Sequence, residues 1–329
     1  MPEETMQAMV YERYGPPEVL QAREVPRPQP GPGQVLVRVH WATVNRTDCH
    51  LLSGSPAVMR LVAGLRRPRK TVPGTEFSGE VAALGQGVTA WREGDKVFGF
   101  DDTGLQACAQ YLVMNADGPL GAVPANRTLE EVAGVLEGVH YARNMCNKVR
   151  LTPGQHALVH GATGAIGSAA LQLLKAAGLH VTATCRGEHA DLIRGLGADA
   201  VLDYTREDFT AGGGPYRAVF DSVGKSTFGR CRPVLEPRGV YVSSELGPWG
   251  QNIPLALAAP LLAPLLRGHV VRFPLPLGTP ASIALAREML EAGTLRVLVE
   301  RTYPLADLAA AYRHAASGEK VGVLRVRVD

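Results

Sequence analysis

The chain has 329 residues, of which 46% are hydrophobic, so it is long enough for about two domains with sizeable cores. Its formal net charge is only +3, and no basic arm or basic stripe with interleaved aromatics accompanies it, which argues against a nucleic-acid-binding protein. The N-terminal sequence MPEETMQAMVYERYG is acidic and lacks the hydrophobic core of a secretory signal. The longest hydrophobic run, Ile253 to Leu266, is short and interrupted by prolines. We therefore expect a cytoplasmic protein with no membrane partner.

Five cysteines, at positions 49, 108, 146, 185 and 231, are scattered singly along the chain. An odd number without any CxxC pair argues against a disulfide framework and against a four-cysteine structural zinc site. We expect five reduced thiols, most of them packed in the interior.

The order of hydrophobic segments changes near residue 127. Before it, short segments such as QVLVRVHWATV and DKVFGF lie between Gly and Pro residues, a pattern typical of strands in a β-barrel. After it, longer helical segments alternate with buried strands, as in a doubly wound α/β domain. The C-terminal part returns to a helix, strand, helix, strand order that can complete the first domain. The sequence therefore predicts an α/β fold with a β-barrel domain at 1–127 and 275–329 and a doubly wound parallel-sheet domain at 128–274.

A glycine-containing turn separates a strand from a helix in HALVHGATGAIGSAALQLLKAAG, residues 156–178. The usual dinucleotide fingerprint is G-x-G-x-x-G with an acid about 20 residues further on, and here Ala162, Gly164 and Gly167 hold the three glycine positions. The positive N-terminus of the following helix would face a pyrophosphate, although small residues also allow close helix packing without a ligand. The predicted contacts of the turn are Gly161, Ala162, Thr163, Gly164, Ala165, Ile166 and Gly167.

The next strand ends at Arg186, where NAD-binding domains carry a carboxylate. A guanidinium group matches a phosphate through two parallel hydrogen bonds, so Arg186 favours NADP(H), with His189 and Tyr204 as further contacts. The alternative for Arg186 is an exposed loop cation. Later strand ends add the candidate cofactor contacts Asp221, Ser222, Val223, Gly224, Ser243 and Ser244.

Several segments together resemble the medium-chain dehydrogenase/reductase superfamily, namely PGTEFSGEVAALGQGVTAWREGDKVFGF, GATGAIGSAALQLLKAAG, LGADAVLDYTRED, VFDSVGKSTF and RTYPLADLAAAYRHAASGEKVG. The resemblance covers nearly the whole chain and is closest to the zinc-independent quinone oxidoreductase-like branch. It implies a GroES-like β-barrel catalytic domain built from both chain ends, an inserted Rossmann domain, and a cofactor cleft at their junction. It also implies that Arg186 and Tyr204 hold the 2′-phosphate of NADP(H), whereas His189 stands where quinone reductases often have Lys.

Zinc-dependent alcohol dehydrogenases of this superfamily take ligands from a Cys three residues before an Asp and from the His of a GHE triplet. This chain has Asn45 before Asp48, and Thr75 before Glu76. Because Asn and Thr bind Zn²⁺ poorly, we expect no catalytic metal.

A reduced nicotinamide can still pass hydride to an electron-poor acceptor such as a quinone or an enone. The element VNRTD resembles the N-x-x-D element of the branch, so we expect Asn45 to donate to the substrate carbonyl and Asp48 to organise neighbouring polar groups. The alternative is a buried turn in which both side chains satisfy backbone groups. Lys320 is a further candidate cofactor contact, although Val323 stands where the branch usually has a basic residue. No Tyr occurs in LSGSPAVM, where enoyl thioester reductases carry a proton donor, so solvent would have to supply the proton.

The sequence thus predicts an NADPH-dependent, zinc-independent oxidoreductase that transfers hydride to quinones or α,β-unsaturated carbonyls. Two alternatives stay open: an alcohol dehydrogenase with an unrecognised metal site, and an NADPH-binding non-enzyme of the crystallin-like or regulatory kind. The run from Arg60 to Lys70, with five cations and no acid, is either a solvated loop or a flap near an anionic ligand. The segment Ile253 to Pro276 is either a buried lobe or a homodimer contact, since related enzymes pair through the edge of the Rossmann sheet.

Overall fold

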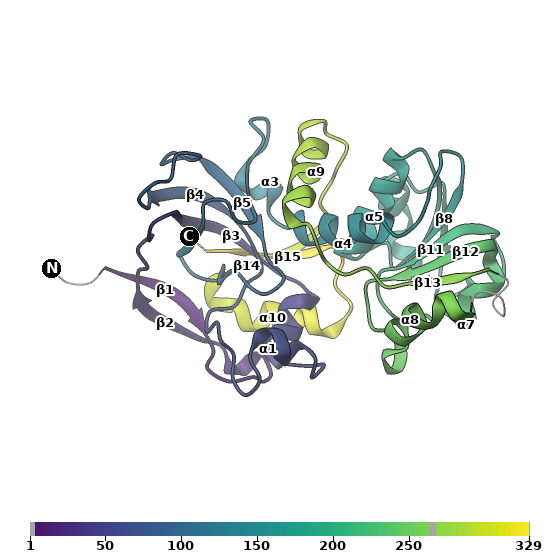
Figure 1. Cartoon of the computed structure of the whole chain (residues 1–329), viewed down its shortest axis with the longest axis horizontal. Coiled ribbons are helices and arrows are strands. Elements are labelled where there is room, and N and C mark those ends of the chain that lie inside the picture. Colours follow the sequence, from purple (N-terminus) through teal and green to yellow (C-terminus); the bar gives the residue numbers. More distant parts are fainter. Residues whose placement is uncertain (1–3, 263–267, 329) are drawn as a thin grey trace. The chain divides into compact units, whose positions relative to one another are not determined.

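The computed structural model describes residues 4–262 and 268–328, which fold into two compact units (Figure 1). The first unit combines the chain up to Glu137 with Thr279–Gly293 and with the residues from Val299 onward. The second unit comprises Gly138–Gly278 and Thr294–Leu298. The predicted ranges differ from these units mainly in the segment 128–137, which the sequence assigned to the second domain.

Specific hydrogen bonds hold the segment 128–137 in the first unit. Ser78 donates to the carbonyl oxygen of Leu129 at 2.7 Å, and the backbone N–H of Leu136 donates to the Glu76 carboxylate at 2.6 Å. Thr128 begins the short helix of this segment through a capping box with Glu131, which pairs two orphan backbone donors locally. The change from strands to helices therefore precedes the boundary between the units.

The first unit is built around a mainly antiparallel sheet. Its strands are β3 (Gln34–Val44), β4 (Glu76–Leu84), β5 (Lys96–Phe100), β6 (Tyr111–Asn115), β7 (Leu120–Ala122), β14 (Val299–Pro304) and β15 (Val323–Arg327). They follow the order β14-β15-β3-β4-β5-β7, with β6 also paired to β3, and only β14 and β15 run parallel. β1 (Thr5–Val10) and β2 (Gln21–Pro26) form a separate antiparallel pair. Since β15 pairs with β3, the C-terminal end of the chain completes the sheet that the N-terminal part begins.

The helices of the first unit are α1 (Arg46–Ser53), α2 (Met59–Ala63), α3 (Leu129–Val132), α9 (Thr279–Glu291) and α10 (Leu308–Ser317), while α4 (Leu136–Cys146) continues into the second unit. One hydrophobic core joins β3 and β15 to α10, because alternate residues of the strands and one face of the helix point inward. Val37, Leu324 and Tyr312 are fully buried in it. This core fixes α1 and α10, which carry residues of the site described below.

The second unit is a six-stranded, fully parallel sheet. Its strands are β8 (His156–His160), β9 (His180–Cys185), β10 (Ala200–Asp203), β11 (Tyr216–Asp221), β12 (Leu235–Ser243) and β13 (Val270–Arg272). Its helices are α5 (Ala165–Ala176), α6 (Ala190–Arg194), α7 (Phe228–Cys231) and α8 (Asn252–Leu262). The strand order is β10-β9-β8-β11-β12-β13, and all neighbouring pairs are parallel.

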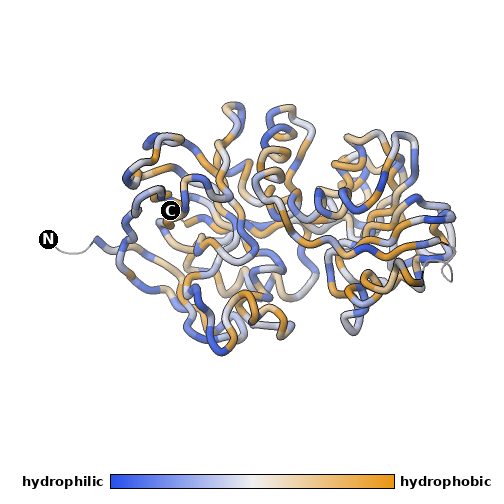
Figure 2. Tube along the Cα trace, in the orientation of Figure 1, coloured by the Kyte–Doolittle hydropathy of each residue, from blue (hydrophilic) through white to orange (hydrophobic). Residues whose placement is uncertain are grey.

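Parallel strands covered on both faces are expected to be hydrophobic over most of their length. The central strands β8 and β11 carry fully buried hydrophobic runs at 157–159 and 218–220, and Figure 2 shows the hydropathy of this unit along the chain. The strand order reverses between β8 and β11, and ligands of doubly wound sheets bind at the carboxyl ends of the strands at this point. The structure thus confirms the predicted α/β fold class with a doubly wound parallel sheet.

The segment Ile253–Pro276 forms α8 and β13, the edge strand of the parallel sheet, while its residues 263–267 lie outside the described part of the chain. Leu257 and Leu261 on α8 are 76% and 84% exposed. A homodimer contact here stays a prediction. Within residues 4–262 and 268–328, no helix is both long enough and hydrophobic enough to cross a membrane.

Candidate active site

The predicted cofactor turn connects β8 to α5. Gly161 has φ of +83°, a left-handed conformation that glycine adopts without strain. A Cβ atom on Gly167 would lie 2.2 Å from the Gly161 carbonyl oxygen, so only glycine lets α5 approach the turn this closely. Around Gly164, in contrast, the nearest atom to such a Cβ is the Gly161 oxygen at 3.5 Å. Packing therefore requires glycine at position 167, whereas position 164 has room for a Cβ atom.

The N-terminus of α5 offers unpaired backbone donors. Its first helical hydrogen bond runs from the Ser168 N–H to the Gly164 carbonyl at 2.9 Å, so the N–H groups of Ala165, Ile166 and Gly167 have no acceptor within the helix. Together with the positive end of the helix dipole, these donors suit a pyrophosphate. The turn fits the group that the sequence predicts.

Arg186 and Tyr204 follow the ends of the neighbouring strands β9 and β10. Their side chains touch, since the Arg186 Nε donates to the Tyr204 hydroxyl at 3.3 Å, and both are exposed. His189 ends a 3-10 helix directly after Arg186, and its Nε2 lies 3.5 Å from a Glu188 carboxylate oxygen. A cation and a hydroxyl donor thus stand side by side where a 2′-phosphate would bind.

Asp221, at the end of β11, is fully buried and directs its carboxylate into its own loop. It accepts hydrogen bonds from the backbone N–H groups of Val223 at 3.2 Å and Gly224 at 2.9 Å, and from the Tyr241 hydroxyl at 2.6 Å. Ser222 donates to the His160 carbonyl at 2.7 Å. The side chains of Asp221 and Ser222 therefore shape the strand ends.

Two serines follow β12 and behave differently. Ser243 bonds locally, accepting from the backbone N–H of Glu245 at 3.2 Å. The Ser244 hydroxyl is buried and lacks a hydrogen-bond partner in the part of the chain that the structure describes. A buried hydroxyl without a partner is destabilising, and a ligand that hydrogen-bonds to the Ser244 hydroxyl would remove this cost.

Asn45 and Asp48 belong to a group of polar side chains in the first unit, which we call the polar cluster. Asn45, Asp48, Thr75, Glu76 and Glu137 are buried, and Lys320 is partly buried. Asn45 is the N-cap residue of α1, and its backbone N–H donates to Asp48 Oδ2 at 2.8 Å. The other oxygen, Oδ1, accepts from the Thr75 N–H at 3.1 Å and from its hydroxyl at 3.0 Å. Asp48 therefore ties the start of α1 to the loop before β4.

Lys320 comes from the C-terminal end of the chain and reaches the same cluster. Its amine donates to Asn45 Oδ1 at 3.0 Å and also to the Gly322 carbonyl. This bond orients the Asn45 amide, whose Nδ2 is buried without a hydrogen-bond partner among the described residues. The structure thus brings together Asn45, Asp48 and Lys320, which the sequence analysis named separately.

Glu137 is a member of the cluster that the sequence analysis missed. Its Oε1 accepts from the Thr47 hydroxyl at 2.8 Å, while its Oε2 is buried and unpaired within the described residues. The sequence did offer a signal, a lone acid among the hydrophobic residues of VLEGVHYA. An acid that is buried in such a stretch is rare unless it is paired.

Burial sets the protonation of the cluster. Loss of hydration raises the pKa of Asp48 to about 6, that of Glu76 to about 7 and that of Glu137 to about 8, the last also through the charge of Asp48. Burial lowers the pKa of Lys320, and Glu137 opposes that change. The Glu137 carboxyl group therefore keeps its proton to a higher pH than an exposed carboxyl group does.

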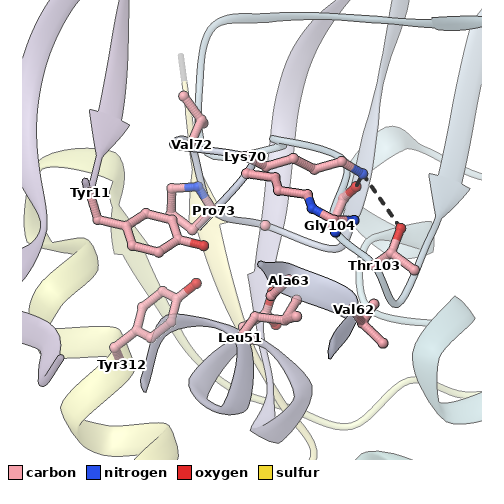
Figure 3. A pocket seen from close by; sticks show the side chains of 13 residues that line it. Tyr11, Leu51, Val62, Ala63, Lys70, Val72, Pro73, Thr103, Gly104 and Tyr312 are labelled. Carbon is pink, nitrogen blue, oxygen red and sulfur yellow. Dashed lines mark hydrogen bonds between the residues drawn. The ribbon is translucent and has the colours of Figure 1, made fainter. Parts of the chain in front are cut away.

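A cavity of about 300 Å³ adjoins the cluster through Asp48 (Figure 3). We call it the tyrosine pocket, since Tyr11 and Tyr312 form one wall. Its other lining residues are Asp48, Leu51, Val62, Ala63, Arg69, Lys70, Val72, Pro73, Gly74, Thr103 and Gly104. In residues 4–262 and 268–328, no group of three or more His, Cys, Asp or Glu side chains is arranged to share a metal ion.

Comparison with known proteins agrees with this architecture. The alcohol dehydrogenase GroES-like domain family matches residues 31–124, and the zinc-binding dehydrogenase family matches residues 196–324. A quinone oxidoreductase of Pseudomonas aeruginosa is 30% identical over 327 residues, covering 94% of this chain and 95% of that protein. A trans-enoyl reductase of Aspergillus terreus is 30% identical over 207 residues, covering 60% of this chain and 57% of that protein. The solved structure of a quinone oxidoreductase from Coxiella burnetii superposes with a TM-score of 0.83 at 24% identity, covering 99% of this chain and all of that one.

The fold and these matches define an oxidoreductase with a GroES-like domain and a Rossmann-type domain. The chain belongs to the medium-chain dehydrogenase/reductase superfamily, and quinone oxidoreductases are among its relatives. The family resemblance and the GroES-like part of the predicted fold class are therefore confirmed.

Proposed function

We propose that this protein is an NADPH-dependent reductase that transfers hydride to quinones or α,β-unsaturated carbonyl compounds without a catalytic metal. The observation that carries the proposal is the polar cluster, in which the amide Nδ2 of Asn45 and the carboxyl Oε2 of Glu137 are both buried without a hydrogen-bond partner among the described residues. Reduction of a conjugated carbonyl needs a hydrogen-bond donor at its oxygen and a proton source. The relatives named quinone oxidoreductase and trans-enoyl reductase support this substrate class.

The proposed cofactor is NADPH, which supplies the hydride when bound. The residues at the strand ends fit it. The first N–H groups of α5, which have no acceptor within the helix, suit the pyrophosphate, and Arg186 with Tyr204 suits the 2′-phosphate. His189 and the unpaired hydroxyl of Ser244 are proposed as further contacts.

Each member of the polar cluster has a proposed role. Asn45 donates from Nδ2 to the carbonyl oxygen of the acceptor, and Lys320 orients the amide by holding its Oδ1. For Lys320 we propose this role in place of a cofactor contact. Asp48 is a positioning residue that fixes the Asn45 backbone. After hydride addition the acceptor is an anion, and Glu137 gives it one proton, which solvent later replaces.

The proposal is tested by mixing the purified protein with NADPH and a panel of quinones and enones, while NADPH affinity is measured separately by calorimetry. We expect cofactor oxidation with some of these acceptors. Asn45→Ala should lower kcat by about 100-fold, the order seen when one oxyanion donor is lost, with NADPH affinity unchanged. Asn147→Ala, at an exposed position, is the matched control. NADPH binding with no turnover on any acceptor would contradict the proposed activity and favour a non-enzymatic NADPH-binding protein.

Alcohol dehydrogenase activity is a second candidate, favoured by the match to the zinc-binding dehydrogenase family. The two candidates differ in their need for metal. We expect purified protein to contain less than stoichiometric zinc and to reduce its acceptors equally well after treatment with a chelator. Stoichiometric zinc, with alcohol oxidation that a chelator abolishes, would favour the second candidate.

A further inference from the structure

The tyrosine pocket has a buried polar wall and an exposed cationic wall. Tyr11, Asp48 and Tyr312 are each at most 5% exposed, whereas Arg69 and Val62 are exposed. Polar groups thus lie at the inner end of the cavity and a positive charge lies at its opening. A molecule that enters would meet these two chemistries at opposite ends.

Two phenol groups converge at the inner end. Tyr11 and Tyr312 both direct their hydroxyl groups toward the pocket (Figure 3). Burial raises the pKa of both groups, so both remain protonated donors. The Tyr312 hydroxyl has no hydrogen-bond partner anywhere in the described residues. An unpaired buried hydroxyl is destabilising, and an oxygen atom of a ligand placed there would accept its hydrogen bond.

The Asp48 carboxylate does not compete for these donors, because three hydrogen bonds from Asn45 and Thr75 already occupy it. The inner end of the pocket therefore offers donors and no free acceptor of similar strength. An oxygen atom such as that of a carbonyl or a phenol group matches it.

Arg69 and Lys70 carry positive charge to the opening. Lys70 donates to the Gly104 carbonyl and to the Thr103 hydroxyl, and within residues 4–262 and 268–328 neither cation forms an ion pair. Both belong to the basic run from Arg60 to Lys70, for which the sequence left open a solvated loop or a flap near an anionic ligand. Their position at a pocket favours the second interpretation.

The remaining walls are hydrophobic. Leu51, Val62, Ala63, Val72 and Pro73 line the space between the tyrosines and the cations. A volume of about 300 Å³ lies at the lower end of the range for small-molecule pockets, so one planar ring fits between the two ends.

We propose that the tyrosine pocket binds a small one-ring carbonyl or phenol compound that carries an anionic substituent. Tyr11 and Tyr312 donate to the oxygen on the ring, and Arg69 pairs with the anionic group. This inference rests on the proposed function and narrows its acceptor class to anionic quinones, in which the tyrosines would hold one carbonyl oxygen and Asn45 the other. Asp48 lines the pocket and accepts from the backbone N–H of Asn45 at 2.8 Å.

Binding is measured by calorimetry on the full chain at low salt with two unreactive probes, 4-hydroxybenzoate and its neutral analogue 4-hydroxybenzamide. We expect about 5-fold tighter binding of the benzoate, the size of a partly exposed ion pair. Arg69→Gln should abolish this preference. Arg66→Gln, an exposed arginine of the same run outside the pocket lining, should keep it. Equal affinity for both probes, or equal effects of the two substitutions, would overturn the proposal.

Tyr312→Phe tests the inner end, since it removes only a buried hydroxyl without a partner among the described residues and should raise the thermal stability rather than lower it. It should weaken both probes by about 3- to 10-fold, and unchanged affinity would overturn the role of Tyr312. Turnover of 1,4-benzoquinone and its carboxylated analogue separates this inference from the proposed function. If the benzoate binds preferentially but no NADPH is oxidised, only the proposed reductase activity is refuted. If both quinones turn over equally and Arg69→Gln changes neither rate, the proposed anion preference of the pocket is refuted.

Discussion

Replacing Asp48 distinguishes a positioning role from a catalytic one. Its carboxylate accepts from two backbone N–H groups and one hydroxyl, at 2.8, 3.1 and 3.0 Å, and it is buried. Asp48→Ala leaves all three donors unpaired at about 1–3 kcal/mol each, and since the hydroxyl can rotate to another partner we expect a loss of about 3–6 kcal/mol. Natural domains are stable by about 5–15 kcal/mol, so much of the Asp48→Ala protein should unfold in moderate denaturant. Asp48→Asn keeps one acceptor oxygen and should lose about 1–3 kcal/mol.

The assay is urea unfolding followed by circular dichroism, with NADPH affinity and kcat measured on the folded protein. The exposed Glu93→Ala is the control and should change stability by less than about 0.5 kcal/mol. We expect stability to fall in the order wild type, Asp48→Asn, Asp48→Ala, with NADPH affinity unchanged. If Asp48→Ala were as stable as the control and kcat still fell more than about 100-fold, Asp48 would act on the substrate and the reasoning would be refuted.

Three further predictions follow from the cofactor turn and the polar cluster. Arg186→Glu should weaken the binding of NADPH by about 10- to 100-fold and that of NADH by less than about 3-fold, and Arg194→Glu, at an exposed position, is the control. Equal losses of affinity for both cofactors would show that Arg186 does not bind the 2′-phosphate. Gly164→Ala should preserve the melting temperature and weaken the binding of both cofactors by about 10-fold. Gly167→Ala should instead lower the stability of the ligand-free protein by about 1–3 kcal/mol. The reverse pattern would exclude Gly164 from phosphate binding. Burial raises the pKa of Glu76 from 4.5 to about 7. The protonated form therefore stabilises the fold fully below about pH 4.5, and this contribution, about 3 kcal/mol, is lost as the pH rises through about 7. Glu76→Gln should flatten this decline in pH-dependent urea unfolding, and an unchanged slope would exclude Glu76 as its source.

The fold was predictable because its signals are local. Alternation of hydrophobic residues gives strands, the 3.6-residue period gives helices, and the turn at Gly161 to Gly167 stands between a strand and a helix within a few residues. The position of Arg186 after β9 follows from the same local order. The segment 128–137 is the exception, because a helical sequence there packs on the first unit through Glu76 and Ser78.

The composition of the site was only partly predictable. Asn45 and Asp48 lie on one motif, and their mutual contact is a helix capping interaction that sequence spacing indicates. Glu137 and the pairing of Lys320 with Asn45 depend on how distant segments pack, and a single sequence does not encode these contacts in any local pattern. The same holds for Tyr11 and Tyr312, which stand near opposite ends of the chain and meet at one pocket.

The most direct test of the central claim follows the hydride itself. The protein is incubated with an enone and with NADPH that carries deuterium at both C4 positions of the nicotinamide, and the product is analysed by mass spectrometry and NMR. The proposed hydride transfer should leave one deuterium at the β-carbon of the reduced enone and one hydrogen from solvent at the α-carbon. Binding of the labelled NADPH with no deuterium in any product would contradict it.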